Sequence, residues 1–349
     1  MINSLTRYPI RRDRFETFYD SLWAIIGSFN LEPSHIHRLP LLFIILAIST
    51  LTASPSVLRI DPLLPKAVIA DKKIQRANEF FGASRRAAAY IDGLLSGRGD
   101  IMLVMSDLLT VRYLILVRRA PDAQPLLGST IARAQACGLH RNSLVFGETE
   151  LEDDQERRSI WSYVYHMDRY CSLLLGRPLA ISDRSFDAEP PMNLDRFGTV
   201  VPPDQVTLNS FLIYRDKLAR IMGQISNEVF ALDDPPYEAV GRIENALQAW
   251  SRLLPPQLAL SPLAGDAASP LMVAIHRHLI FTEYNFARIS LHRPYLVRPD
   301  PSGRFARSRD ACLDAAIDDL TIRTASRVPG MENLSTGSYR IANSIIILG

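Results

Sequence analysis

Cysteine is scarce in this sequence, and the two signs of charge nearly cancel. The 349 residues include three cysteines, Cys137, Cys171 and Cys312, with no C-x-x-C pair among them. Such a sparse, odd set offers no disulfide framework and no zinc-site spacing, and it is typical of a reducing compartment. The 39 lysines and arginines against 37 aspartates and glutamates leave a net charge of +2. This balance excludes a globally basic nucleic-acid coat and an acidic tail protein.

Apolar segments long enough to cross a membrane are also missing. The run Leu39–Ala53 has 15 residues, fewer than the roughly 20 that a spanning helix needs. The run Ile101–Val117 is interrupted by Asp107 and Arg112, and a charge at the centre of a bilayer is costly. Both runs predict buried helices of a large helical core, and we expect no membrane association. The arginine-rich start is not followed by an apolar stretch and cleavage site, so no secretory signal is predicted.

Helical periodicity is what the sequence has in abundance. Over Ile160–Leu174, apolar residues recur at steps of 4, 3, 4 and 3, which places them on one face of a helix. Gly176 and Pro178 predict its end, because glycine accepts a left-handed cap and proline cannot continue a helix. A second such pattern covers 270–292. Strand alternation bounded by hairpin turns is absent, so the sequence predicts an all-α protein.

The same periodicity predicts further helices at about 13–28, 38–53, 66–96, 100–119, 123–137, 204–231, 236–253, 307–327 and 335–348. Two proline-rich stretches, 182–203 and 254–270, are candidate linkers. Neither is long or biased enough to define a domain boundary, and no repeat of fixed period is present. We therefore predict one large, irregular multi-helix domain over residues 1–349, with sub-boundaries near these two stretches.

The histidines do not have the spacing of a metal site. Two His-x-His pairs, at 35–37 and 276–278, place their imidazoles on different faces of a helix, with no third ligand nearby in sequence. We interpret them as surface or core-edge histidines and predict no metal and no cofactor in this chain. The sequence also lacks a G-x-S-x-G elbow, an H-E-x-x-H helix, a P-loop and a G-x-G-x-x-G turn.

Other candidate reactive groups favour structural interpretations. Cys171 lies on the apolar face of the first predicted helix, where a buried thiol without a base is inert. Asp183, Asp187 and Glu189 cluster in one loop but lack the spacing of a calcium loop. We interpret this segment as a solvated loop that begins with a turn at Ser182 or Asp183. Basic clusters are short and are not interleaved with aromatic residues, so they do not predict a nucleic-acid surface.

Asp168 is the most informative charged residue. It follows Trp161 and Val164 on the same helix and flanks the apolar face rather than facing water. A carboxylate in that position needs a partner, and Arg158, Arg177 or an arginine of another helix are the candidates. We favour a structural ion pair that fixes helix packing over a catalytic role, because structural networks also perturb the pKa values of their members.

Several short segments occur in an order and spacing that one known family shares. A helix ends with G-L-H-R at Gly138–Arg141, and the next helix, Glu156–Tyr170, carries paired arginines, a tryptophan and an Asp-Arg step. The segment L-G-R-P-x-x-I-x-D follows at Leu175–Asp183, then L-H-R-P-x-L at Leu291–Leu296 and S-R-x-x-C at Ser308–Cys312. Together these segments resemble the fungal-specific transcription factor domain, the middle homology region of fungal binuclear zinc-cluster regulators.

The resemblance implies an all-helical regulatory domain of nuclear proteins that activate or repress metabolic genes, often within biosynthetic gene clusters. The family has no established catalytic residues, so no enzyme activity is expected. The matched residues are helix ends, helix stops and ion-pair partners. We predict structural roles for Gly138, Leu139, His140, Arg141, Arg158, Trp161, Asp168, Arg169, Gly176, Arg177, Pro178, Asp183, His292, Arg293 and Pro294.

One part of the family pattern is missing from this sequence. Family regulators usually carry an N-terminal module of six cysteines that holds two zinc ions, followed by a coiled-coil linker, whereas here no cysteine precedes Cys137. The resemblance without this module implies that the chain acts with other transcription regulators, such as a full-length zinc-cluster protein, rather than by reading DNA itself. A nuclear location and a small-molecule effector are further expectations of the resemblance.

Two alternatives stay open at the level of sequence. The same scaffold could serve as a recruited enzyme or small-molecule-binding protein of secondary metabolism, with Asp168, His166 and Tyr170 lining a pocket between helices. The apolar end Ile345–Leu348 predicts either a helix that docks in the core or a truncated or decayed form of a longer regulator.

Overall fold

The computed structural model describes residues 10, 12–26, 33–95, 100–142, 151–195, 197–231, 236–259, 271–325 and 344–347. Within these ranges the chain forms α-helices and short 3-10 helices, with no β-strand and a single antiparallel bridge between Leu194 and Val200. The prediction of an all-α, multi-helix fold is confirmed.

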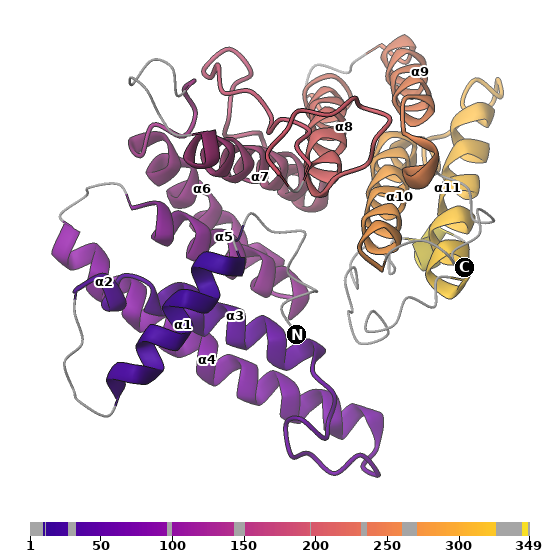
Figure 1. Ribbon diagram of the computed structural model, residues 1–349. Helices are drawn as coiled ribbons and strands as arrows, with labels where there is room; N and C mark the ends of the chain where they lie inside the picture. The colour runs from indigo at the N-terminus through magenta and orange to yellow at the C-terminus, as the bar shows by residue number, and fades with distance from the viewer. Residues whose placement is uncertain are drawn as a thin grey trace. The chain divides into compact units, whose positions relative to one another are not determined.

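The helices belong to two compact units (Figure 1). The first unit contains α1 (Arg12–Ile26), α2 (Pro33–Ile36), α3 (Leu39–Thr52), α4 (Lys66–Leu95), α5 (Ile101–Leu116) and α6 (Ala120–Ala136). The second contains α7 (Leu151–Leu175), α8 (Leu208–Glu228), α9 (Glu238–Arg252), α10 (Leu271–His292) and α11 (Ala306–Ala325), with 3-10 turns at Pro256–Leu258 and Arg293–Tyr295. The proposed sub-boundaries near 182–203 and 254–270 both lie inside the second unit, and the single-domain organisation stays a prediction.

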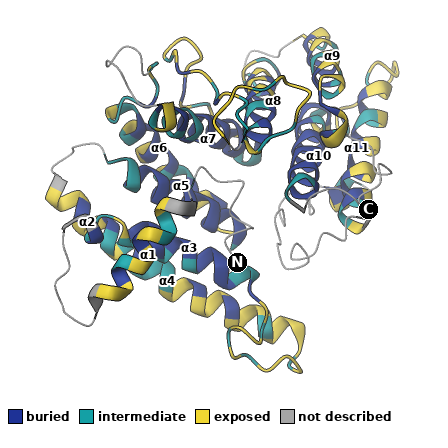
Figure 2. Cartoon of the chain, in the orientation of Figure 1, coloured by how far each residue is buried: buried dark blue, intermediate teal, exposed yellow. Residues whose placement is uncertain are grey.

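Two apolar helices form the core of the first unit. Helix α3 packs against α4 and α5, and α5 packs against α6. Both α3 and α5 are buried over most of their length (Figure 2), as expected for core helices. Asp107, which interrupts the second apolar run, is buried beside Arg85 and Arg133, at oxygen–nitrogen distances of 2.6 and 3.5 Å. Among the described residues, no helix is long and apolar enough to span a bilayer.

Helix α6 ends at Ala136 and is followed by a left-handed turn at Gly138. The φ angle of Gly138 is 69°, and its N–H donates to the carbonyl of Gln135 at 2.9 Å. The N–H of Leu139 donates to the carbonyl of Ala134 at 3.0 Å. These bonds satisfy the last carbonyls of the helix, and glycine adopts the positive φ without steric cost. The G-L-H-R segment thus ends a helix of the first unit.

An exposed glycine in the middle of α6 offers a test of helix energetics. A Cβ added at Gly128 would meet no atom within 4 Å. Since glycine loses more backbone entropy than alanine on folding, we expect Gly128→Ala to raise the free energy of unfolding by about 0.5–1 kcal/mol. The matched control is Gly176→Ala, where φ is 64° and a loss of about 1–2 kcal/mol is expected. Urea unfolding measures both, and equal effects of the two substitutions would contradict this account.

Helix α10 is central in the second unit. It packs against α8, α9 and α11, while α7 packs against α8, and Figure 2 shows α7 and α10 in dark blue over much of their length. On α7, Ile160, Val164, Met167 and Cys171 are all buried. The interpretation of this segment as one helix with an apolar face is therefore confirmed.

The final predicted helix, 335–348, lies mostly outside the described residues. Its described part, Ser344–Ile347, is helical. The hydroxyl of Ser344 donates to the Asp319 carboxylate at 2.9 Å, and Ile347 packs against an apolar cluster between α10 and α11.

Candidate functional site

Residues of the sequence motifs form two buried polar networks in the described part of the second unit, and the first is at the end of α7. Gly176 has a φ of 64°, and the N–H of Arg177 donates to the carbonyl of Ser172 at 3.1 Å. The Ser172 hydroxyl in turn donates to the carbonyl of Arg177. The chain therefore reverses at the Gly-Arg-Pro step, and the loop that follows returns along α7.

Asp168 is the anchor for this returning loop. Its side chain is 1% exposed, and its two oxygens accept hydrogen bonds from the backbone N–H groups of Ala180 and Ile181 at 3.0 and 3.1 Å. It also pairs with Arg169 at 2.5 Å. Burial raises the pKa of Asp168, and the backbone hydrogen bonds and the charge of Arg169 oppose that rise.

Arg169 joins the loop to the helix from the other side. Its fully buried guanidinium binds both Asp168 and Asp183, the latter at 2.6 Å. It also lies over the ring of Tyr165, 3.8 Å from the centroid, and the Tyr165 hydroxyl donates to Asp183 at 2.7 Å. The Asp-Arg step of α7 and the final aspartate of the L-G-R-P segment are thus parts of one ion network. This contact explains in physical terms why the two segments occur together.

The partner that the sequence suggested for Asp168 was wrong. Arg158 instead pairs with Asp154 at 2.7 Å and with Glu189 at 2.9 Å, and the Arg177 side chain is exposed. The actual partner is the next residue in the chain. Neighbouring residues point in different directions from a helix, so a pair between them was not expected. The long Arg169 side chain reaches both Asp168 and Asp183, the second carboxylate being supplied by the returning loop.

The carboxylates of the loop 183–189 are exposed, as predicted for a solvated loop: Asp183, Asp187 and Glu189 all face solvent. A turn does begin at Ser182, whose carbonyl accepts from the N–H of Ser185 at 3.0 Å. Asp183 and Glu189, however, bind arginines of α7. Between them, Phe186 packs edge-on against Trp161 with ring centroids 5.5 Å apart.

The two His-x-His pairs do not come together as ligands. His37 binds the Asp100 carboxylate at 2.9 Å through Nδ1. His276 is buried rather than at the edge of the core, is stacked on Phe211 at 4.5 Å between centroids, and burial lowers its pKa to about 4. Over the described part of the chain, no group of three or more His, Cys, Asp or Glu side chains is placed to hold a metal ion.

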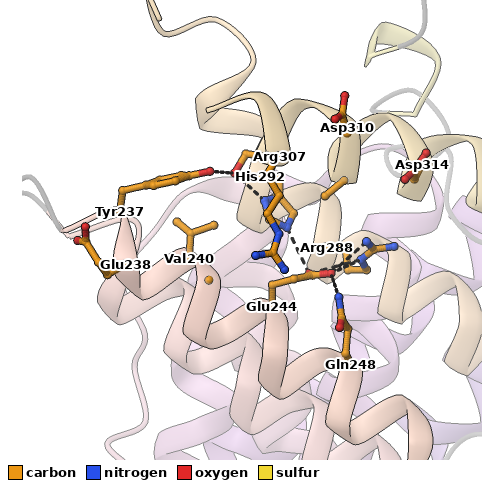
Figure 3. Close-up of a pocket in the computed structure, with 13 residues that line it drawn as sticks. Tyr237, Glu238, Val240, Glu244, Gln248, Arg288, His292, Arg307, Asp310 and Asp314 are labelled. Atoms are coloured by element: carbon orange, nitrogen blue, oxygen red, sulfur yellow. Dashed lines mark hydrogen bonds and ion pairs between the residues drawn. The ribbon is translucent and has the colours of Figure 1, made fainter. Parts of the chain in front are cut away.

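The second network forms the inner wall of a pocket of about 330 Å³ between α9, α10 and α11 (Figure 3). Its lining residues come from all three helices and their ends: Tyr237, Glu238, Val240, Gly241, Glu244, Gln248, Arg288, His292, Arg307, Ser308, Asp310, Ala311 and Asp314.

Glu244 is the centre of the inner wall. Its buried carboxylate accepts from Gln248 at 2.9 Å, pairs with Arg288 at 3.0 Å and lies 3.2 Å from Nε2 of His292. Burial alone would raise the pKa of Glu244. The hydrogen bond to His292, the charge of Arg288 and the bond from Gln248 outweigh burial and lower that pKa to about 2. The side chain is therefore a permanent carboxylate at neutral pH.

His292 connects this carboxylate to α11. Its Nδ1 lies 3.0 Å from the hydroxyl of Ser308, which lies 2.8 Å from the hydroxyl of Tyr237. The L-H-R-P and S-R-x-x-C segments therefore meet through His292 and Ser308. The order serine, histidine, carboxylate is also that of a nucleophile with its base. Here the serine is 1% exposed and engaged on both sides by Tyr237 and His292, so we assign the chain of bonds to helix packing.

Arg293 and Pro294 continue this motif beyond α10. They form the 3-10 turn Arg293–Tyr295, in which proline occupies an early position where its missing N–H costs nothing. The ring of Tyr295 packs against Tyr237 and Phe305 at 5.0 and 5.1 Å. The turn thus adds an aromatic cluster beside the pocket.

Sequence reasoning identified His292 but missed the pocket. Asp168, His166 and Tyr170, which the alternative interpretation placed around a pocket, do not line this one. His166 instead bonds Glu283 at 3.1 Å and stacks on Tyr170. The sequence did contain one signal for the Glu244 network. Glu244 is a charged residue within the apolar face of α9, one residue after the buried Ile243.

The fold and both networks are those of an all-helical scaffold whose buried charges join helices to loops and to each other. The chain belongs to the family described as the fungal specific transcription factor domain, whose model matches residues 8–252.

Similar proteins carry names of transcription regulators. The chain is 25% identical over 222 residues to the Zn(2)-C6 fungal-type transcription factor pigI of Monascus ruber, which covers 61% of this chain and 27% of that protein. It is 27% identical over 290 residues to the uncharacterized transcriptional regulatory protein C1F7.11c of Schizosaccharomyces pombe, at 79% and 35% coverage. It is 23% identical over 207 residues to the pyrrolocin cluster transcription factor fsdR of a fungal species (strain NRRL 50135), at 57% and 27% coverage.

The matched part of the chain thus spans about a quarter to a third of the length of these relatives. No solved structure is significantly similar.

Proposed function

We propose that this chain regulates the transcription of fungal metabolic genes, and of a biosynthetic gene cluster in particular. Membership in the family carries the proposal, and a relative named for the pyrrolocin cluster supports the narrower part. The two buried networks are consistent with a scaffold, because their charged groups are occupied by one another rather than directed at a substrate.

In this proposal the chain works in the nucleus together with other transcription regulators, including a full-length zinc-cluster protein. The relatives named as Zn(2)-C6 factors support this kind of partner. Affinity capture of the tagged chain from nuclear extract, with the partners identified by mass spectrometry, tests it. Recovery of a zinc-cluster protein or of promoter DNA supports the proposal. If neither is recovered, the proposal is contradicted.

Deletion of the gene tests the proposed function itself. We expect transcripts of a coherent, co-located gene set to rise or fall, and the metabolites of that set to follow. The competing function is an enzyme or small-molecule carrier on the same scaffold. It predicts unchanged transcripts together with the build-up of one pathway intermediate, and that result would overturn the regulatory role.

A further inference from the structure

The face of α11 that lines the pocket carries both signs of charge. Arg307, Asp310 and Asp314 occur at steps of three and four residues, so they lie on one face of the helix. In Figure 3 the Arg307 side chain extends from α11 into the pocket towards Glu244, while the two aspartates lie further along the helix. The α11 side of the pocket therefore presents one cation and two carboxylates.

One cation that lines the pocket, the exposed Arg307, has no partner among the described residues. Glu244 and Arg288 neutralise each other at 3.0 Å. Arg307 has no ion pair or hydrogen bond with any residue in the described part of the chain. A guanidinium in such a position offers two parallel N–H groups, which match the geometry of a carboxylate.

Two carboxylates of α11 that line the pocket are also unpaired within the described ranges. Asp310 and Asp314 are exposed and have no ion-pair partner among the described residues. A ligand with only a carboxylate would be attracted by Arg307 and repelled by both aspartates. A ligand with only an amine would be attracted by both aspartates and repelled by Arg307. A ligand with one group of each sign matches the whole set.

The pocket also has apolar lining. Val240, Ala311 and the ring of Tyr237 line the pocket and can hold a small apolar body. The volume of about 330 Å³ is at the lower end of the range for small-molecule sites, roughly 300–1,000 Å³. The dimensions therefore suit a compact metabolite and not a polymer.

We propose that this pocket binds a small zwitterionic metabolite of the amino-acid class. Its carboxylate pairs with Arg307, and its ammonium group pairs with Asp310 or Asp314. A ligand in this position contacts both α9 and α11, which the Glu244–His292–Ser308 bonds already connect, so its binding stabilises the packing of these helices. The role of such a ligand as a regulatory signal rests on the proposed function; its binding does not.

Binding is tested with the purified full chain and a panel of the proteinogenic amino acids, by thermal unfolding and titration calorimetry. We expect at least one amino acid to raise Tm in a concentration-dependent way. The matched probes are the carboxylic acid that lacks the amine and the amine that lacks the carboxylate, and both should bind at least about tenfold more weakly, since each loses a charged hydrogen bond. Equal binding of either probe, or no binding by any amino acid, overturns the proposal.

Substitutions assign the binding to this pocket. Arg307→Gln should raise Kd at least about tenfold, whereas Arg252→Gln, an exposed arginine of α9 outside the pocket, should not change it. Gly241→Leu should abolish binding by filling the cavity, and the helix accepts it because a Cβ at Gly241 meets no atom within 4 Å. Binding that survives both pocket variants overturns the assignment.

The two proposals fail separately. If deletion leaves transcripts unchanged while the purified chain still binds an amino acid through Arg307, the regulatory role is wrong and the binding site stands. If deletion changes transcripts but no amino acid binds, the regulator stands and the ligand assignment is wrong.

Discussion

Asp168→Asn is expected to lower the free energy of unfolding by about 3–5 kcal/mol, the usual cost of removing one partner of a buried ion pair. The two Asp168 oxygens accept from different backbone N–H groups, of Ala180 and Ile181. An asparagine must place its own NH2 group against one of these donors. The substitution also takes away the negative charge that pairs with the fully buried Arg169. Thermal or urea-induced unfolding of the purified proteins measures the loss.

The control for this substitution is Glu189→Gln, in the same returning loop. Glu189 also binds an arginine of α7, but its side chain is 66% exposed and Arg158 keeps its second partner, Asp154. An exposed pair of this kind contributes about 0–1 kcal/mol. If Asp168→Asn and Glu189→Gln cost the same, the buried network does not fix the loop on α7.

Glu244→Gln is expected to cost about 3 kcal/mol at neutral pH. Glutamine keeps the shape of the side chain but leaves Arg288, 14% exposed, without its carboxylate, and gives His292 a neutral partner. Since Glu244 connects α9 to α10, we expect the whole second unit to be affected rather than one loop. Urea unfolding of the variant beside the wild-type chain measures the effect.

The same pair of proteins gives a pH dependence with a defined sign. The pKa of Glu244 is lowered from 4.5 to about 2 by folding. Its contribution to stability is therefore fully present above about pH 4.5 and is lost as the pH falls towards 2. The lowered pKa corresponds to roughly 3 kcal/mol. The difference in unfolding free energy between wild type and Glu244→Gln should shrink between pH 6 and pH 3 by much of that amount, and a constant difference would contradict the account.

The parts of this fold that depend on local chemistry could be predicted from sequence. The helix over Ile160–Leu174 follows from apolar residues at steps of three and four, and its end follows from Gly176 and Pro178. Burial of α3 and α5 follows from the length and composition of their apolar runs. These signals act within one or two helical turns, so one segment contains all the information.

The polar networks depend on contacts that no single segment contains. Glu244 meets His292 across 48 residues, and His292 meets Ser308 across 16. Even the pairing of Asp168 with its neighbour Arg169 requires the loop near Asp183 to return along α7. Periodicity gives the face on which a charge lies, but the partner on another helix is set by tertiary packing. The family motifs indicated which residues matter, and the distances show what they do.

The central claim is that this chain acts on transcription. The most direct test is rapid depletion of the tagged chain in its native fungus, with nascent transcripts and metabolites followed together. We expect a coherent gene set to change its transcription before any metabolite level moves. Accumulation of one pathway intermediate while nascent transcription stays constant would contradict the account and assign the scaffold to chemistry.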